Sequence, residues 1–127
     1  MFGGIKRDVA DSYFSKYLRL LRNFTCEHCG KKGEDGSMEA SHFWGRRNES
    51  VRFDEENVSC LCNYCHRVFT ENPHRHQDWM RQKLGEKRYK LLMIRAQTYS
   101  KKDRKLQALL WKQEYRALCK ERGIKPK

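Results

Sequence analysis

Four cysteines of the sequence form two Cys-x-x-Cys pairs, Cys26 with Cys29 and Cys62 with Cys65. Two intervening residues allow both sulfur atoms of a pair to turn toward one ion, and two such pairs supply the four ligands of a tetrahedral zinc site. A site with four cysteine ligands has no open position for a substrate. The spacing therefore predicts a structural zinc ion that holds the fold together and takes no part in catalysis.

Two further cysteines, Cys60 and Cys119, lie outside these pairs. Cys60 is close enough to the second pair to be an alternative zinc ligand. The other interpretation is that it is a small buried residue of a strand, because free cysteines are among the most buried side chains in proteins.

Histidine and asparagine residues with the potential for hydrolytic chemistry surround the second cysteine pair. His42 and Asn57 precede this pair, and His66 comes directly after it. The spacing from Asn57 through the second pair to His66 resembles the zinc-knuckle branch of the HNH nucleases, which belong to the ββα-metal class. The resemblance implies a DNA endonuclease that uses a divalent metal ion.

A longer stretch, about residues 12–95, is similar to phage-encoded HNH proteins akin to the NinG/Rap recombination proteins. The similarity ends before the last helix expected from the sequence. It implies that the DNA cleaved is a branched or recombination intermediate. The segments that carry the similarity are residues 15–20, 42–47, 52–57 and 84–86.

The HNH resemblance implies a role for each of the three polar residues. Hydrolysis of a phosphodiester needs a base that activates water and a cation that stabilises the leaving oxygen. His42 matches the general base, and an imidazole suits proton abstraction near neutral pH. His66 matches a ligand of the catalytic ion, Mg²⁺ or Mn²⁺. Asn57 matches the residue that holds the loop between the strands or fixes the His42 ring.

Ser41 departs from the pattern of many HNH enzymes, which carry aspartate or histidine at this position as a second metal ligand. A serine hydroxyl is a poor ligand for Mg²⁺ or Mn²⁺, which prefer carboxylate oxygen. Either another residue supplies the ligand, or the metal is held weakly, or catalysis has been lost. Asp54 is our first choice for the missing ligand, Glu55 is near it in sequence, and His74 and His76 come next.

Three arginines, Arg46, Arg47 and Arg52, flank the expected site. Guanidinium groups suit phosphate contacts, so Arg47 or Arg52 could brace the phosphate that is cleaved. The alternative is ordinary salt bridges to Glu49 or Asp54.

The charge of the chain is distributed unevenly. Its 28 lysines and arginines and 16 acidic residues give a net charge of +12. Residues 1–71 are electrically neutral in sum, so the whole excess lies in residues 72–127. Such segregation favours a polyanionic partner, here DNA, although a solvated helical face is the alternative. The residues we assign to DNA contacts in this part are Lys101, Lys102, Arg104 and Lys105.

The composition excludes several classes of protein. The charged fraction is 35%, the mean hydropathy is −1.01, and no stretch is long and apolar enough for a membrane span or a signal peptide. We therefore expect a cytoplasmic protein of a phage or prophage in its bacterial host, without a membrane partner. No small-molecule substrate is implied, and the oligomeric state stays open.

The hydrophobic pattern predicts an α+β fold, in which a small ββα-metal module on the zinc site is flanked by N- and C-terminal helices. We divide the chain into an N-terminal amphipathic helix (1–25), the zinc-stapled module (26–71) and a basic helical extension (72–127). The expected helices cover 8–23, 63–71, 73–84 and 86–96, with a last one that opens at the capping box 100–103 and ends near 123; the expected strands cover 38–43 and 58–61. We expect the buried side of the last helix to consist of Leu106, Leu109, Leu110, Ala117 and Leu118.

These observations favour a metal-dependent DNA endonuclease. An HNH nicking nuclease that acts in phage DNA packaging is an enzymatic alternative. The alternative from another class is a catalytically silent zinc module that only binds nucleic acid, and Ser41 is the feature that favours it.

Overall fold

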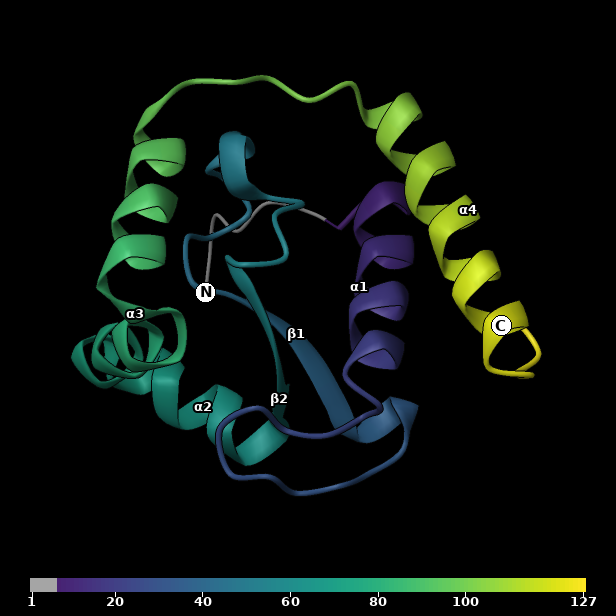
Figure 1. The fold of residues 1–127 in the computed structure, drawn as a ribbon, viewed down its shortest axis with the longest axis horizontal. Helices are drawn as coiled ribbons and strands as arrows, with labels where there is room; N and C mark the ends of the chain where they lie inside the picture. Colours follow the sequence, from purple (N-terminus) through teal and green to yellow (C-terminus); the bar gives the residue numbers. More distant parts are fainter. Residues whose placement is uncertain (1–6) are drawn as a thin grey trace.

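A two-stranded antiparallel sheet lies at the centre of the fold (Figure 1). In the computed structural model, which describes residues 7–127, the strands are β1 (Met38–His42) and β2 (Val58–Cys62). Met38 pairs with Cys62 and His42 with Val58, so the loop between the strands leaves the sheet beside His42. Both strands were expected from the sequence, and their bounds agree to within one residue.

Helices cover the sheet from two sides (Figure 1). One side holds α1 (Val9–Leu21) and, outside it, α4 (Arg104–Glu121). The other side holds α2 (Asn63–Glu71) and α3 (Pro73–Gln97). Two short 3₁₀ helices, η1 (Asp35–Ser37) and η2 (Glu49–Val51), lie in the loops before and after β1. The α+β class predicted from the sequence is confirmed.

Helix α1 begins at a capping box. The Asp8 carboxylate accepts the backbone N–H of Asp11 at 3.0 Å, and the Asp11 carboxylate accepts that of Asp8 at 2.9 Å. Phe14 and Leu18, one and two turns further on, are buried against the sheet together with Val58. The helix therefore starts at a fixed residue and presents a fixed apolar face to the strands.

The chain passes from β2 into α2 without a linker. Cys62 ends the strand and is also the N-cap of the helix, because its sulfur accepts the N–H of Cys65 at 3.4 Å. Helix α3 is interrupted at Gly85, whose φ of +80° favours glycine. The two helices predicted on either side of this residue are confirmed. Both pack on the 3₁₀ helix η2 through Met80, Leu84 and Leu92.

Helix α4 runs beside α1 in the same direction (Figure 1). Its N-cap is Asp103, which accepts the N–H of Leu106 at 3.0 Å, so the expected opening at Ser100 is wrong. Tyr115, Leu118 and Cys119 are buried against α1.

The expected buried face of α4 is wrong except at Leu118. Leu106, Leu109 and Leu110 are 59%, 66% and 40% exposed, and Ala117 is also exposed. Helix α4 lies outside α1 and packs against it along one stripe (Figure 1). That stripe carries Trp111 and Tyr115, whose larger rings bury more apolar area than leucine does.

Candidate metal centre and adjoining cleft

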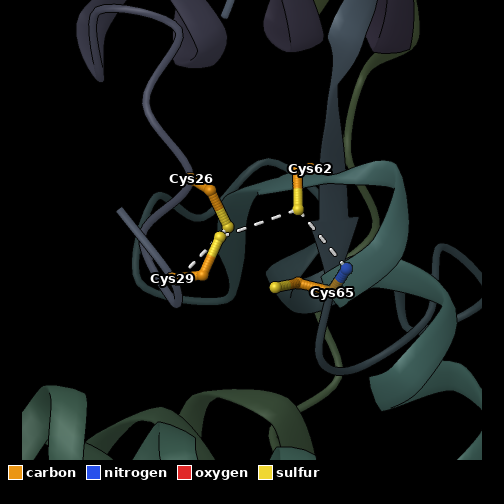
Figure 2. Close-up of side chains that lie close together, drawn as sticks. All are labelled: Cys26, Cys29, Cys62 and Cys65. Carbon is orange, nitrogen blue, oxygen red and sulfur yellow. Dashed lines mark hydrogen bonds between the residues drawn. The ribbon is translucent and has the colours of Figure 1, made fainter. Parts of the chain in front are cut away.

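The two cysteine pairs come together at one end of the sheet. Their four sulfur atoms all lie within 4.8 Å of one another, and those of Cys29 and Cys62 are 3.9 Å apart (Figure 2). Four sulfurs at about 2.3 Å from a zinc ion would stand about 3.8 Å apart. The four cysteines could therefore hold one metal ion of this size, as the spacing in the sequence predicts.

The first pair lies in a tight turn that follows α1. A bridge between Thr25 and Lys32 closes this turn, and Cys26 donates its N–H to the carbonyl of Lys31 at 2.8 Å. Gly30 adopts a φ of +78°, which bends the chain back beside the pair. The second pair needs no turn of its own, because it occupies the start of α2.

The surroundings of one sulfur atom of the cluster, that of Cys26, favour the thiolate, whereas burial and neighbouring thiols raise the pKa of Cys65. Burial alone would raise the pKa of Cys26, but backbone N–H groups, first that of Cys29 and then that of Cys62, lower this pKa to about 7. Cys60 differs, since burial and then the nearby Glu27 carboxylate raise its pKa to about 12. Cys60 lies outside the cluster, fully buried in β2, so the interpretation as a strand residue is confirmed.

Two side chains of the first turn, Glu27 and His28, and Lys83 of α3 brace this metal centre. Glu27 accepts the N–H of Cys60 at 2.6 Å and pairs with the Lys83 ammonium at 2.8 Å. His28 places its Nδ1 atom 3.2 Å from the sulfur of Cys65, and its ring lies 4.7 Å from that of Phe69. Neither contact was predicted, because both depend on how the first turn sits against α2 and α3.

Asn57 holds the loop between the strands. It is completely buried, and its side-chain oxygen accepts the N–H of Trp44 at 2.8 Å. Its amide nitrogen donates to the carbonyls of Trp44 at 2.9 Å and Val51 at 3.0 Å. Of the two roles implied by the resemblance, these contacts match the one in which the asparagine holds the loop.

His42 stands where β1 ends and this loop begins. Its Nε2 atom lies 2.9 Å from the carbonyl oxygen of Arg52, which can only accept a hydrogen bond. The neutral ring must therefore carry its proton on Nε2, which leaves the lone pair on Nδ1. Burial lowers the pKa of His42 to about 4, against a weaker opposing effect of the Arg52 carbonyl, so the ring is neutral at neutral pH.

A cleft of about 290 Å³ lies between α1, β1 and the start of α2. Both His42 and His66, which the HNH resemblance assigns to one site, line this cleft. The cleft also brings in Glu39, whose carboxylate oxygen lies 3.2 Å from the Nδ1 atom of His66. The residues that line the cleft are Arg7, Asp11, Ser15, Glu39, Ala40, His42, Gly45, Arg46 and His66.

Glu39 was not predicted as a site residue. It precedes His42 by three positions on a five-residue strand. In the sequence it is one of several charges in a polar segment, and only the antiparallel pairing of β1 with β2 brings it beside the helix that bears His66.

The three arginines have different positions. Arg52 is only 2% exposed and pairs with Asp11, so its assignment to a DNA or phosphate contact is wrong. Arg46 lines the cleft, and its Nη1 atom is buried 3.8 Å from the Asp11 carboxylate, without a hydrogen-bond partner among the described residues. Arg47 is exposed and lines a neighbouring depression of about 520 Å³ beside Tyr99.

The residues expected to supply the missing metal ligand do not line the cleft. Asp54 pairs with the guanidinium of Arg95 at 2.7 Å, in a separate depression beside Trp111. His76 is buried and its ring is stacked on Phe69, with the ring centroids 4.7 Å apart. His74 is exposed at the start of α3.

The basic residues near the start of α4 also divide into two groups. Arg104 forms ion pairs with Asp8 and Glu49 and thereby ties α4 to α1 and to the loop. These carboxylate partners neutralise its charge, and its assignment to a DNA contact stays a prediction. Lys101 and Lys105 are exposed, and Lys102 is partly exposed.

The fold and the cysteine cluster define a small α+β protein with a candidate four-cysteine metal centre. The family model described as "Bacteriophage Lambda NinG protein" matches residues 7–123, and the chain therefore belongs to the NinG family. The match extends through α4, beyond residues 12–95, which carry the resemblance described above. Neither the curated proteins nor the solved structures gave a significant match. Within residues 7–127, no helix has the length and apolarity that a bilayer crossing requires.

Proposed function

We propose that this protein is an HNH-type endonuclease that hydrolyses phosphodiester bonds of DNA with the aid of a divalent metal ion. The observation that carries the proposal is the convergence of His42 and His66 in one cleft, although they come from a strand and a helix far apart in the sequence. The membership in a phage protein family agrees with a role in DNA metabolism, such as the processing of recombination intermediates or of DNA for packaging.

The four cysteines act in this proposal as a structural zinc site. Cys65 is followed directly by His66, and Cys62 caps the same helix. An ion held by the cluster would therefore fix the start of α2 and with it the position of His66 relative to β1. A zinc ion with four sulfur ligands has no open coordination position, so the reaction must take place in the cleft.

His42 is the proposed general base. Its Nε2–H is engaged by the Arg52 carbonyl, so Nδ1 is the atom that would take a proton from water as a P–O bond to that water forms and the P–O bond to the leaving oxygen breaks. The low pKa of His42 keeps Nδ1 unprotonated. A phosphodiester anion bound beside the ring would raise this pKa toward neutrality, which improves the base.

Glu39 and His66 are the proposed ligands of the catalytic ion. A carboxylate oxygen and an imidazole nitrogen 3.2 Å apart are donors that Mn²⁺ and Mg²⁺ accept. In this proposal Glu39 takes the place of Asp54 and fills the role that Ser41 cannot. When bound, the ion would stabilise the charge on the leaving oxygen.

Arg46 is the proposed phosphate contact. Its Nη1 atom lies 3.8 Å from the Asp11 carboxylate, too far for a hydrogen bond, and has no hydrogen-bond partner among the described residues, so a phosphate bound in the cleft would supply one. Asp11 is an unsuitable ligand for the ion, because Arg52 already occupies its carboxylate.

Nicking of supercoiled plasmid by the purified protein, with Mg²⁺ or Mn²⁺ added, tests the proposal. His42→Ala should lower the rate by about a hundredfold to ten-thousandfold, because a positioned base typically contributes that much. The zinc content and the affinity for DNA should not change. Wild-type protein that binds the plasmid but never nicks it with either ion would favour the silent DNA-binding module instead.

Glu39→Gln tests the assignment of the metal ligands. The variant should need a higher Mn²⁺ concentration for half-maximal nicking, since an amide oxygen binds the ion less tightly than a carboxylate. Asp54→Asn is the matched control, because it removes the same charge outside the cleft. If Asp54→Asn shifts the Mn²⁺ requirement and Glu39→Gln does not, Asp54 is the ligand after all.

A further inference from the structure

A groove of about 580 Å³ lies between the N-terminal halves of α1 and α4. It is separate from the cleft that contains His42 and His66. Asp11 faces the cleft, whereas Val9 and Tyr13, two positions before and after it on α1, face the groove. Positions two apart on a helix point in nearly opposite directions. The groove is lined by Asp8, Val9, Ala10, Tyr13, Arg104, Lys105, Ala108, Leu109 and Lys112.

The floor of the groove is apolar and open to solvent. Val9 and Leu109 are 62% and 66% exposed, and Ala10 and Ala108 lie between them in the lining of the groove. Helix α4 already buries Tyr115, Leu118 and Cys119 on α1, so Leu109 contributes little to its packing. Contiguous exposed apolar surface on a small protein commonly marks a binding site for another macromolecule.

The charges around this floor favour an acidic occupant. The carboxylate of Asp8 is neutralised by Arg104, which also pairs with Glu49. Lys105 and Lys112 remain at the edge of the groove, and neither forms an ion pair with a described residue. Lys112 places its ammonium 6.0 Å from the centroid of the Tyr13 ring.

A second copy of this chain would be a poor occupant. The chain carries a net charge of +12, with the excess in residues 72–127, so two such surfaces would repel each other. DNA is also a poor match for the whole groove, since its phosphates could pair with lysines at the edge but would leave Val9 and Leu109 exposed to water. We propose that the groove docks a short acidic segment of a partner protein, with large apolar side chains on the α1–α4 floor and carboxylates beside Lys112.

The binding of synthetic peptides to the full-length protein tests this proposal. The probe is a fluorescein-labelled peptide with leucines at helical spacing and glutamates elsewhere, followed by fluorescence anisotropy in buffer without added magnesium or manganese. One comparison peptide has serine in place of each leucine, and the other has lysine in place of each glutamate. The acidic leucine peptide should bind, and both comparison peptides should bind at least about tenfold more weakly.

Variants locate the binding to the groove. Leu109→Ser and Lys112→Glu should each weaken the binding of the acidic leucine peptide by about tenfold or more. Ile94→Ser is the matched control, because Ile94 is similarly exposed but lies on α3, and this variant should bind like wild type. Circular dichroism of each variant verifies the fold.

Three results would overturn the proposal: equal binding of all three peptides, unchanged binding by both groove variants, or absence of binding. Self-association of the wild type in sedimentation, lost in Leu109→Ser, would assign the groove to a second copy instead. The experiment involves neither His42 nor a divalent ion. Its failure would therefore leave the proposed nuclease activity unaffected.

Discussion

The guanidinium group of Arg52 lies against the carboxylate of Asp11, with 2.9 Å between Nε and Oδ1. Both side chains are almost completely shielded from water. The pair joins the first helix to the loop between the strands, and the backbone carbonyl of the same arginine accepts the hydrogen bond from His42. A single residue thus ties the position of the proposed base to α1. The Arg52 guanidinium also holds the pKa of Asp11 below its ordinary value, although burial alone would raise it.

Asp11→Asn should therefore cost much more stability than an equivalent change in an exposed pair. Removing one charge of a buried pair typically costs about 3 to 5 kcal/mol, and we expect the lower end of this range because Arg52 keeps longer ion pairs with Glu49 and Asp8, at 3.7 and 3.9 Å. The matched control is Asp54→Asn, whose partner Arg95 is about two-fifths exposed, and exposed pairs contribute up to about 1 kcal/mol. Urea denaturation of both variants measures the difference in the free energy of unfolding. Equal losses would show that the pair on α1 is no more important than one at the surface.

Substitutions of two neighbouring cysteines, Cys62 and Cys60, should have different effects on the metal centre. Cys62→Ser should lose the bound ion and most of the secondary structure, since Cys62 contributes to the cluster and caps α2. Cys60→Ala is the matched control, because Cys60 is just as buried in the same strand but lies outside the cluster. It should keep the ion and lose only some packing energy. Elemental analysis and circular dichroism measure both effects, and a well-folded, metal-free wild type would contradict the proposed zinc site.

The sequence predicts the elements near the cysteines well, because local signals fix them. Gly85 and the proline at the start of α3 mark the ends of helices, and the two Cys-x-x-Cys pairs need no tertiary information. The meeting of His42 and His66 was also expected, but through the HNH resemblance. These predictions depend on spacing along the chain, which folding does not alter.

Predictions that depended on which face of an element meets which neighbour were less successful. Arg52 was assigned to DNA because its carboxylate partner, Asp11, lies on a different element 41 positions away. Leu109 was assigned to the core because it lies on an apolar stripe, but α4 buries the adjacent stripe with Trp111 and Tyr115. Glu39 was missed because only strand pairing brings it to His66.

His76 should make the stability of the protein depend on pH. Burial lowers its pKa to about 4, from an ordinary value of 6.5, so the unfolded chain binds a proton more readily than the folded one between these values. The part of the free energy of unfolding that depends on a neutral His76 is fully present above pH 6.5 and is lost as the pH falls toward 4. Because a pKa unit corresponds to about 1.4 kcal/mol, the loss is on the order of 3 kcal/mol.

His76→Phe should remove this pH dependence and retain the ring stacked on Phe69. The free energy of unfolding is measured for both proteins at several pH values between 4 and 7. Protonation of the cysteines affects both proteins alike, so the difference between them isolates His76. The variant should gain stability relative to wild type as the pH falls. A difference that does not change with pH would mean that His76 is not kept neutral by burial.

Lys101 and Lys105 should provide part of the attraction to DNA. Both lysines are exposed near the start of α4. The neighbouring Arg104 is held in ion pairs, so of the four residues assigned to DNA in this segment we test these two lysines. Each phosphate neutralised adds about −0.9 to the slope of log K against log salt on duplex DNA. If both lysines contact phosphates, their double reversal to glutamate should flatten the slope by about 1.8.

The matched control for this double variant is Lys31→Glu with Lys32→Glu, which changes the net charge equally in the turn of the first cysteine pair, where we assign no DNA contact. Fluorescence anisotropy with duplexes of several sequences, at a series of salt concentrations, measures both variants. The loss caused by reversal of Lys101 and Lys105 should be similar for all sequences, because phosphate contacts position a protein without reading bases. Equal effects of the two variants would mean that the affinity for DNA depends on net charge alone. An unchanged slope after reversal of Lys101 and Lys105 would leave this end of α4 as a solvated helical face.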